Sequence, residues 1–396
     1  MSQQLINHNS DLHRLLDDGY EVSIQNGHLV VTNIPYLNSK CEICFGTLVS
    51  TLSLSGNKTI RPNPHTMMFA GEYPCDERGR PLEKIRNQSN LVRIGEAVTI
   101  SHTFSCKPKC GYYSDYYEKV STYATILCSP AAYINADVTP RTHRIIDAPD
   151  DSPFVYCDNA SGRAGITSIT QKLKQRSVAI IGLGGTGSYV LDLVSKTPVK
   201  EIHLFDGDIF EQHNAFRCPG AASIEQLSAR LPKVEYLTSA YKHMHKGIVP
   251  HAEYISPENT NLLSNQSMVF ICIDNNEAKV PIIEALEEYD IPFIDVGMGL
   301  QLVNSGLTGT LRTTTSVAQF RKHVRSRNRI PINSIQGNNV YDQNIQVADL
   351  NSMNACLAVI RWKKLCGFYV DMENEHFNLY SIEGNHILNE DTECDE

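Results

Sequence analysis

A glycine-rich loop carries the clearest chemistry in this chain of 396 residues. The run Gly182-Leu-Gly184-Gly185-Thr-Gly187 fits the pattern G-x-G-x-x-G, and it stands between an apolar strand-like run and a helical one. Glycines let the backbone turn tightly and approach a phosphate, and the free N–H groups at a helix start attract that anion. Asp206, at the end of the next apolar run, is placed to hold ribose hydroxyls. These residues predict a nucleotide site, which an NAD-dependent oxidoreductase would also need.

The residues that follow Asp206 indicate which class of nucleotide-binding protein this chain resembles. Residues 206–217, DGDIFEQHNAFR, resemble the D-x-D-x(5)-N-x(2)-R signature of the family of ubiquitin-activating and molybdopterin- or thiamine-pathway adenylyltransferases. Residues 232–235, PKVE, are similar to the P-K-x-E helix start of that family, and residues 274–275 to its D-N pair at a strand end. The resemblance covers about residues 160–370.

The resemblance implies an adenylation reaction, in which a carboxylate oxygen joins the α-phosphate of ATP and pyrophosphate leaves. Because negative charge accumulates on the phosphates, cations must already be in place around them. The family pattern assigns Arg217 and Lys233 to the phosphates, Asn214 to the phosphates or adenosine, and Asp274 to Mg²⁺, with Asp208 as a further candidate ligand. The expected cofactors are therefore ATP and Mg²⁺. A dehydrogenase needs no such cations, and no convincing His–carboxylate arrangement for hydride transfer is visible in the sequence.

Arg163 is a catalytic candidate from outside this run. Members of the family send an arginine from just upstream of the first strand into the site of the partner subunit, and Ser161-Gly-Arg163 stands in that neighbourhood. The resemblance thus implies a homodimer with two composite sites. The tyrosine-containing signature that usually surrounds this arginine is not intact here.

The chain departs from the thioester-forming members of the family, because it has no cysteine between Cys272 and Cys356. Those members carry a catalytic cysteine in this region, and many carry zinc-binding C-x-x-C pairs. Either the adenylate passes directly to a downstream acceptor, or another residue forms the covalent intermediate. Thr315 and Ser316, in the run TTTS, are candidates for an oxyester, and Cys218 beside the predicted phosphate site is an alternative. The basic segment that follows, residues 321–329, can clamp a phosphate or an acidic partner or can simply be solvated.

Strands and helices must bring these residues together at one edge of a sheet. Apolar runs at 177–181, 201–205, 268–273 and 292–296 predict strands that alternate with helices, the signature of a parallel sheet covered on both faces. Residues 300–316 alternate and predict antiparallel strands, followed by a helix at 348–367 and a hairpin at 377–389. The predicted fold class is α/β, a Rossmann-like doubly wound sheet with added antiparallel strands and a crossover loop.

The chain divides into two predicted domains. Residues 1–150 are expected to form a smaller, strand-rich α+β domain, and residues 151–396 a ThiF-like adenylation domain. A polar stretch with prolines at 141–156 marks the linker. For the N-terminal domain we expect recognition of the modifier or of a conjugating partner.

Composition and cysteine usage exclude some functions. With 35 Lys and Arg against 44 Asp and Glu, the net charge of −9 argues against nucleic acid as a partner. No apolar run approaches the ~18–20 residues that span a bilayer, and no secretion signal is present, so a cytoplasmic protein without membrane contact is expected. The pairs Cys41/Cys44 and Cys106/Cys110 are either two halves of a zinc site or reduced thiols.

The leading hypothesis is an ATP-dependent activating enzyme for a ubiquitin-like protein that ends in glycine. The enzyme would adenylate the terminal carboxylate and pass the modifier to a conjugating enzyme. Details such as residues 213–221, HNAFRCPGA, resemble bacterial members of the family that are encoded with ubiquitin-like modifiers, a setting associated with antiviral defence. The alternatives are a small-molecule or peptide adenylyltransferase of the same fold and a non-catalytic nucleotide-binding scaffold.

Overall fold

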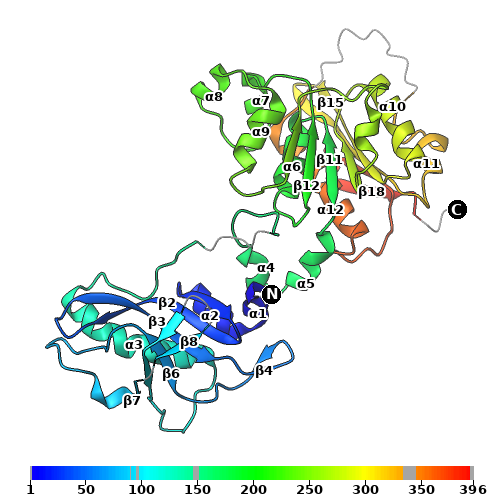
Figure 1. Cartoon of the computed structure of the whole chain (residues 1–396). Coiled ribbons are helices and arrows are strands. Elements are labelled where there is room, and N and C mark those ends of the chain that lie inside the picture. Colours follow the sequence, from blue (N-terminus) through cyan, green and yellow to red (C-terminus); the bar gives the residue numbers. More distant parts are fainter. Residues whose placement is uncertain (1, 90, 95–97, 146–150, 333–344, 393–396) are drawn as a thin grey trace. The chain divides into compact units, whose positions relative to one another are not determined.

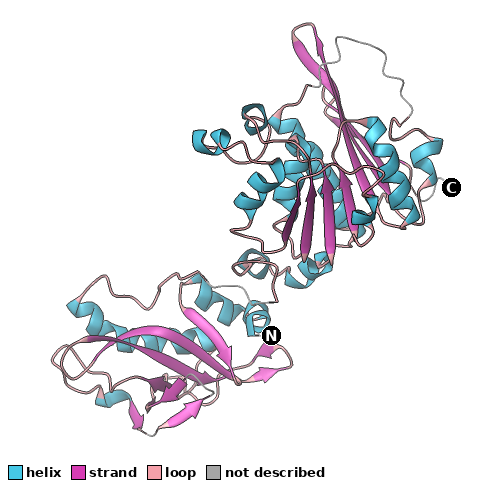
Figure 2. Ribbon diagram, turned by 45° about the horizontal axis from the view of Figure 1, so that its top comes forward, coloured by secondary structure: helices cyan, strands magenta, loops and turns pink. Residues whose placement is uncertain are grey.

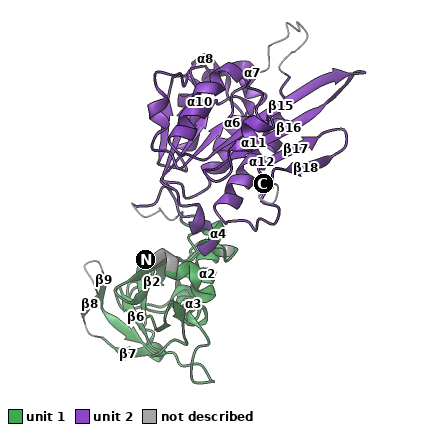
Figure 3. Cartoon of the chain, turned by 90° about the vertical axis from the view of Figure 1, so that its right-hand side faces the viewer, with its two compact units in different colours: residues 1–146, 158–167 green, residues 147–157, 168–396 purple. Residues whose placement is uncertain are grey.

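The computed structural model describes residues 2–89, 91–94, 98–145, 151–332 and 345–392. The chain forms two compact units, one of residues 1–146 with 158–167 and one of residues 147–157 with 168–396 (Figure 3). The segment Asp158–Thr167 therefore belongs to the N-terminal unit, although the predicted boundary at residue 150 placed it in the C-terminal domain. Part of the predicted linker, residues 146–150, lies outside the described residues.

The N-terminal unit is an antiparallel sheet that packs against helices (Figure 1). Its helices are α1 (Ser2–His8), α2 (Ser10–Asp17), η1 (Glu83–Ile85), α3 (Tyr116–Ile134) and α4 (Asn159–Arg163). Its strands are β1 (Glu21–Gln25), β2 (His28–Leu37), β3 (Ile43–Thr51), β4 (Leu54–Ser55), β5 (Lys58–Thr59), β6 (Met67–Ala70), β7 (Arg86–Gln88), β8 (Val92–Ile94), β9 (Val98–Ile100) and β10 (His102–Phe104). The main sheet has the order β1-β2-β3-β6-β10-β7, and its core includes Leu15 of α2 with Val120 and Tyr123 of α3.

The C-terminal unit contains the predicted nucleotide residues. Its helices are α5 (Thr167–Thr170), η2 (Gln171–Leu173), α6 (Gly185–Val194), α7 (Gln212–Ala215), α8 (Ile224–Ser228), α9 (Lys233–Tyr241), η3 (Thr260–Leu263), α10 (Asn276–Glu288), α11 (Lys322–Ser326) and α12 (Ala348–Leu365). Its strands are β11 (Ser177–Ile181), β12 (Glu201–Phe205), β13 (Ile248–His251), β14 (Met268–Ile271), β15 (Phe293–Val303), β16 (Gly306–Ser316), β17 (Phe377–Ser381) and β18 (His386–Glu390).

These strands form one mixed sheet in the order β13-β12-β11-β14-β15-β16-β17-β18. The first five strands are parallel. The other three, β16, β17 and β18, each pair antiparallel with the strand before them in this order. The chain thus has the predicted Rossmann-like α/β fold with added antiparallel strands. The predicted hairpin near the C-terminus is confirmed as the β17–β18 pair.

Helices cover both faces of the parallel part of the sheet, as Figure 2 shows. All five residues of β11 are buried, and their side chains alternate between two cores. Val178 and Ile180 pack with residues of α6, α9 and α12, whereas Ala179 and Ile181 pack with residues of α10. A strand buried on both faces favours apolar residues on both, which explains the apolar run at 178–181. Ser177, at the start of the strand, donates its hydroxyl to the carbonyl oxygen of Asn265 at 2.9 Å.

Among the helices that the structure describes, none combines the length and the apolar character needed to cross a membrane.

Candidate nucleotide-binding site

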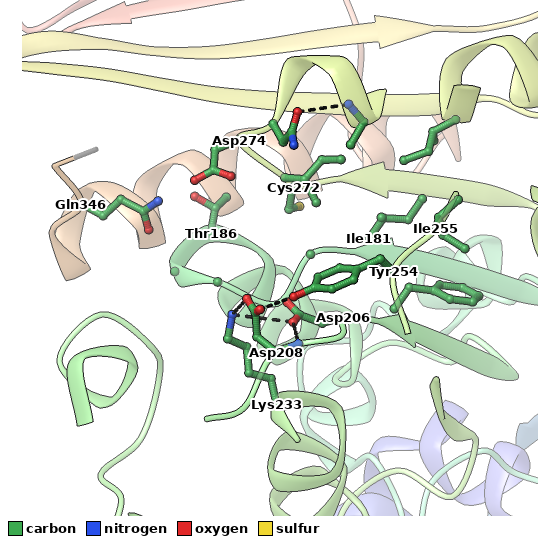
Figure 4. Close-up of a pocket in the computed structure, with 18 of the residues that line it drawn as sticks. Ile181, Thr186, Asp206, Asp208, Lys233, Tyr254, Ile255, Cys272, Asp274 and Gln346 are labelled. Atoms are coloured by element: carbon green, nitrogen blue, oxygen red, sulfur yellow. Dashed lines mark hydrogen bonds and ion pairs between the residues drawn. The ribbon is translucent and has the colours of Figure 1, made fainter. Parts of the chain in front are cut away.

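The predicted nucleotide residues meet at the carboxyl edge of the parallel strands. The loops that follow β11, β12 and β14 surround a cavity of about 380 Å³. Strand β11 lies at the point where the strand order reverses, and such switch points are where open α/β sheets bind ligands. Figure 4 shows Asp206, Asp208, Lys233 and Tyr254 grouped on one side of this cavity, which we call the nucleotide cavity. Of the residues predicted from the sequence to bind the nucleotide, the following line this cavity: Gly182, Gly184, Gly185, Asp206, Asp208, Arg217, Lys233 and Asp274.

The four glycines of the loop have different tasks. Gly182 has φ of +87°, and a Cβ there would lie 2.9 Å from the carbonyl oxygen of Cys272. Gly187 allows the first turn of α6 to pack on the loop, and Gly185 leaves room for the amide of Asn351. A Cβ at Gly184 meets nothing within 4 Å, although this residue lines the cavity. Three of the glycines therefore serve packing, and Gly184 keeps space open for a ligand.

Asp206 joins two of the loops around the cavity. It is 5% exposed, and its carboxylate accepts hydrogen bonds from the backbone N–H of Leu183 at 2.7 Å and of Asp208 at 2.9 Å. Both oxygens are thus engaged with the backbone of the glycine loop and of the β12 loop. Asp206 lines the cavity as expected, and it also fixes the shape of the loop.

Lys233 forms ion pairs with two carboxylates in this structure. Its Nζ lies 2.6 Å from Oδ2 of Asp208 and 3.6 Å from Oδ1 of Asp206, and its side chain is buried. Tyr254 donates to the other oxygen of Asp208, and Gly207 leaves room for the tyrosine ring. Burial opposes ionisation of Asp208, but the bonds from Lys233 and Tyr254 hold its pKa below the ordinary value. The bond to Asp208, aided by burial, raises the pKa of Tyr254 to about 12.

Arg217 lines the cavity with an unsatisfied donor. Its Nε is buried and has no hydrogen-bond partner, and within the described ranges no carboxylate forms an ion pair with it. A buried guanidinium N–H without an acceptor is costly unless a ligand supplies one. Arg217 thus fits an anion such as a phosphate.

Asn214 has a different position from the one expected. It is fully buried, and it does not line the nucleotide cavity. Its Oδ1 accepts from the backbone N–H of Glu211 at 2.9 Å and caps the short helix α7. In this structure Asn214 stabilises the loop that carries Arg217, and it does not line the cavity where phosphates or adenosine would bind.

Asp274 is an exposed carboxylate at the mouth of the cavity, in the loop that follows β14. Figure 4 places it beside Thr186, across the glycine loop from Asp208. The next residue, Asn275, caps α10 by accepting from the N–H groups of Glu277 and Ala278. A carboxylate at this position suits Mg²⁺, which usually takes one or two carboxylates and completes its shell with phosphate oxygens and water. Asp208 fits this role less well because Lys233 and Tyr254 occupy its oxygens.

The structure contradicts Thr315 and Ser316 as nucleophiles. Both are fully buried in β16, and the register pairs Ser316 with Phe293 at the start of β15. Because β16 runs antiparallel, its end lies at the amino edge of the parallel strands, opposite the nucleotide cavity. Neither residue lines this cavity, so neither hydroxyl can reach an adenylate there.

Cys218 is also unsuited to attack. Its thiol is 6% exposed and points to the carbonyl oxygen of Gly184 at 3.9 Å, beneath the glycine loop. Burial raises the pKa of this thiol, although Arg217 opposes the shift. Desolvation of the thiol therefore outweighs the effect of the neighbouring guanidinium of Arg217.

The basic segment after β16 is occupied by acidic partners. Arg321 pairs with Asp290, Arg325 with Glu287, and both Arg327 and Arg329 with Asp391. These pairs hold α11 against the rest of the unit, and they favour a structural role over a phosphate clamp.

The remaining candidates lie in the N-terminal unit. Arg163 is the last residue of α4, within the segment that belongs to that unit, and its side chain lies outside the described part. Across the residues for which coordinates are given, no group of three or more His, Cys, Asp and Glu side chains is arranged to hold a metal ion. The two cysteine pairs are thus free thiols in this structure, not halves of one zinc site.

Sequence reasoning missed Tyr254 and a second cavity of about 330 Å³. This acceptor cavity, as we call it, shares Thr186, Cys272, Ile273, Asp274 and Gln346 with the nucleotide cavity. It is otherwise lined by residues of α10, β15, β16, β17 and α12, including Lys279, Arg312, Asn351 and Asn354. No local motif marks these positions, because they come from distant parts of the chain.

The fold and the glycine loop are characteristic of nucleotide-binding α/β proteins. The model of the ThiF family matches residues 158–379, and a domain of unknown function (DUF6791) matches residues 10–159. The chain therefore belongs to the ThiF family of adenylyltransferases, which confirms the resemblance seen in the sequence.

Similar proteins cover only part of the chain. Ubiquitin-like modifier-activating enzyme 5 of Aedes aegypti is 26% identical over 155 residues, which are 36% of this chain and 38% of that protein. The enzyme of the same name from Culex quinquefasciatus is 24% identical over 178 residues, 42% and 44% of the two chains. This chain thus spans less than half the length of these relatives. E. coli MccB has 13% identity and a TM-score of 0.46, over 78% of this chain and 93% of the solved one.

Proposed function

We propose that this protein adenylates the terminal carboxylate of a ubiquitin-like protein at the expense of ATP. The observation that carries the proposal is Arg217, whose buried Nε lacks a partner at the wall of a cavity with a glycine loop and an exposed Asp274. This arrangement offers a donor for phosphate, N–H groups at the start of α6 and a carboxylate for a metal.

In this proposal some residues bind the phosphates, and others place positive charge beside them. The N–H groups at the start of α6 and the Arg217 guanidinium would bind the phosphates, and the open space at Gly184 would admit them. Asp274 would hold Mg²⁺, which when bound supplies positive charge to the phosphates. Lys233 would contribute its charge from the pair with Asp208 or move from that pair to a phosphate.

The reaction forms one bond and breaks one. A carboxylate oxygen of the acceptor bonds to the α-phosphorus, and the bond from that phosphorus to the pyrophosphate oxygen breaks. Pre-placed cations stabilise the charge that develops on the departing pyrophosphate.

The relatives named ubiquitin-like modifier-activating enzyme 5 support a ubiquitin-like acceptor, and we propose that this acceptor ends in glycine. We propose that the adenylate passes directly to a conjugating enzyme, without an oxyester, since Thr315 and Ser316 lie on the opposite edge of the sheet. We further propose a homodimer in which Arg163 completes the partner's site. The N-terminal domain would recognise the modifier or the conjugating enzyme.

ATP–pyrophosphate exchange tests this proposal. Purified protein should exchange labelled pyrophosphate into ATP when a ubiquitin-like protein ending in glycine is present, and truncation of the terminal glycine should stop the exchange. Exchange that needs only a small carboxylic acid would favour a small-molecule adenylyltransferase. ATP binding without exchange for any acceptor would favour a scaffold.

A further inference from the structure

The acceptor cavity has one buried and one partly buried cation, Lys279 and Arg312, with a carboxylate between them. Lys279 Nζ lies 2.6 Å from Oδ1 of Asp295, and Arg312 Nη2 lies 2.6 Å from Oδ2 of the same residue. Asp295 is fully buried, and Lys279 is 2% exposed. The Arg312 side chain is 14% exposed. One carboxylate cannot neutralise two cations, so this largely buried cluster carries a net positive charge.

The cluster is built rigidly. Arg312 also donates to Oγ1 of Thr314 at 2.9 Å. Gly297 leaves room for the guanidinium of Arg312, because a Cβ at this position would lie 2.6 Å from Nη2 of Arg312. Two strands and a helix thus hold both cations in fixed positions before any ligand arrives.

Both cations line the acceptor cavity, and neither lines the nucleotide cavity. The two cavities meet at Thr186, Cys272 and Asp274. Asp274 is an opposing negative charge, but it lies at this exposed junction. A ligand drawn toward Lys279 and Arg312 therefore lies next to the nucleotide and not in its place.

The opposite wall of the acceptor cavity is polar and neutral. Asn354 donates to the carbonyl oxygen of Gly297 at 3.2 Å, and Thr186 donates to Oδ1 of Asn351 at 3.0 Å. These bonds tie α12 to the glycine loop and to β15. The wall adds no negative charge that would balance the two cations.

An unbalanced buried charge is unfavourable unless a counter-charge binds. We propose that Lys279 and Arg312, bridged by Asp295, recognise the carboxylate of the acceptor and attract it toward the nucleotide. This inference rests on the proposed function and assigns its acceptor specificity to three residues that no local motif marks. Lys279 and Arg312 act as specificity-determining residues, and Asp295 positions them.

Two small probes test the inference. N-acetylglycine carries a carboxylate, and N-acetylglycinamide is its neutral analogue of nearly the same shape. Ligand-observed NMR with the full chain should detect binding of the acid at millimolar concentration, with a preference over the amide of roughly tenfold or more. A chain that binds both probes equally, or neither, overturns the proposal.

The variants Lys279→Met and Arg312→Met make the test specific. Each leaves one cation paired with Asp295, so each neutralises the cluster without stranding a buried carboxylate. Both variants should lose the preference for the acid and keep the wild-type affinity for ATP. Lys242→Met, at an exposed position after α9, is the matched control and should behave as wild type.

The ATP titration distinguishes a failure of the proposed function from a failure of the role assigned to Lys279 and Arg312. Absence of ATP binding by the wild type would contradict the proposed function. Normal ATP binding with an unchanged acid preference in Lys279→Met and Arg312→Met would contradict only the assignment of these residues. A thermal melt confirms that each variant is folded.

Discussion

A Cβ on Gly187 would lie 1.9 Å from the carbonyl oxygen of Gly182, so the two ends of the glycine loop touch through their backbones. This contact ties the start of α6 to the end of β11. The loop is therefore closed by packing at its base, whereas a Cβ at Gly184, which lines the nucleotide cavity, would enter open space.

Gly184→Ala and Gly187→Ala should separate binding from folding. Gly184→Ala should keep the melting temperature within about 2 °C of wild type, because its methyl group enters open space, but should weaken ATP binding at least tenfold. Gly187→Ala should lower the stability by more than about 2 kcal/mol, because the backbone must move. Thermal melts and ATP titrations check both. Equal loss of stability in the two variants would contradict the division of tasks.

Arg217→Met should abolish pyrophosphate exchange without destabilising the protein. The substitution removes a buried N–H that has no partner, so the melting temperature of the ligand-free protein should be unchanged or higher. Arg230→Met is the control, since this arginine forms an exposed ion pair with Glu211 and should affect neither property. A marked loss of stability in Arg217→Met would indicate a structural role.

The pair between Lys233 and Asp208 predicts a pH dependence. The folded-state pKa of Asp208 is lowered, so its contribution to stability is complete above the unfolded-state pKa of about 3.9 and is lost as pH falls through the folded value. Asp208→Asn should therefore melt slightly below wild type between pH 8 and about 5, and the gap should close below about pH 4. The gap should be small because the Asp208 side chain is 51% exposed and water screens the pair. A gap that widens on acidification would contradict the assignment.

Thr315→Val should leave exchange intact and should not destabilise the protein. The Thr315 hydroxyl is buried without a hydrogen-bond partner, so its removal should be neutral or stabilising by up to about 1 kcal/mol. Thr314→Val is the matched control, because Oγ1 of Thr314 bonds to Arg312 and to the carbonyl of Arg329, and its loss should cost about 1 kcal/mol. Denaturant titrations measure both. An alkali-labile modifier adduct that disappears in Thr315→Val would restore the oxyester hypothesis.

Arg163→Ala and Asp274→Ala test the proposed composite site. Each variant alone should lack exchange activity, whereas a mixture that has exchanged subunits should recover part of it, because heterodimers contain one intact site. Native mass spectrometry verifies that the heterodimers form. No recovery despite their formation would remove Arg163 from the partner's site.

The sequence alone determined the glycine loop, the acid Asp206 and the alternation of strands and helices. These features are local: a turn, a helix start and a continuously apolar strand are encoded by neighbouring residues. The helix start at Lys233 was predicted from the family resemblance of residues 232–235, and it is confirmed by α9.

The tertiary structure decided which of the predicted residues face the cavity. Asn214 caps a helix, and Lys233 pairs with Asp208, since a buried polar group takes whichever partner the fold brings within reach. Thr315 was excluded by strand direction, because the antiparallel course of β16 carries it to the far edge of the sheet. The cluster of Lys279, Asp295 and Arg312 exists only because α10, β15 and β16 pack against one another. The spacing of these residues along the chain does not predict this packing.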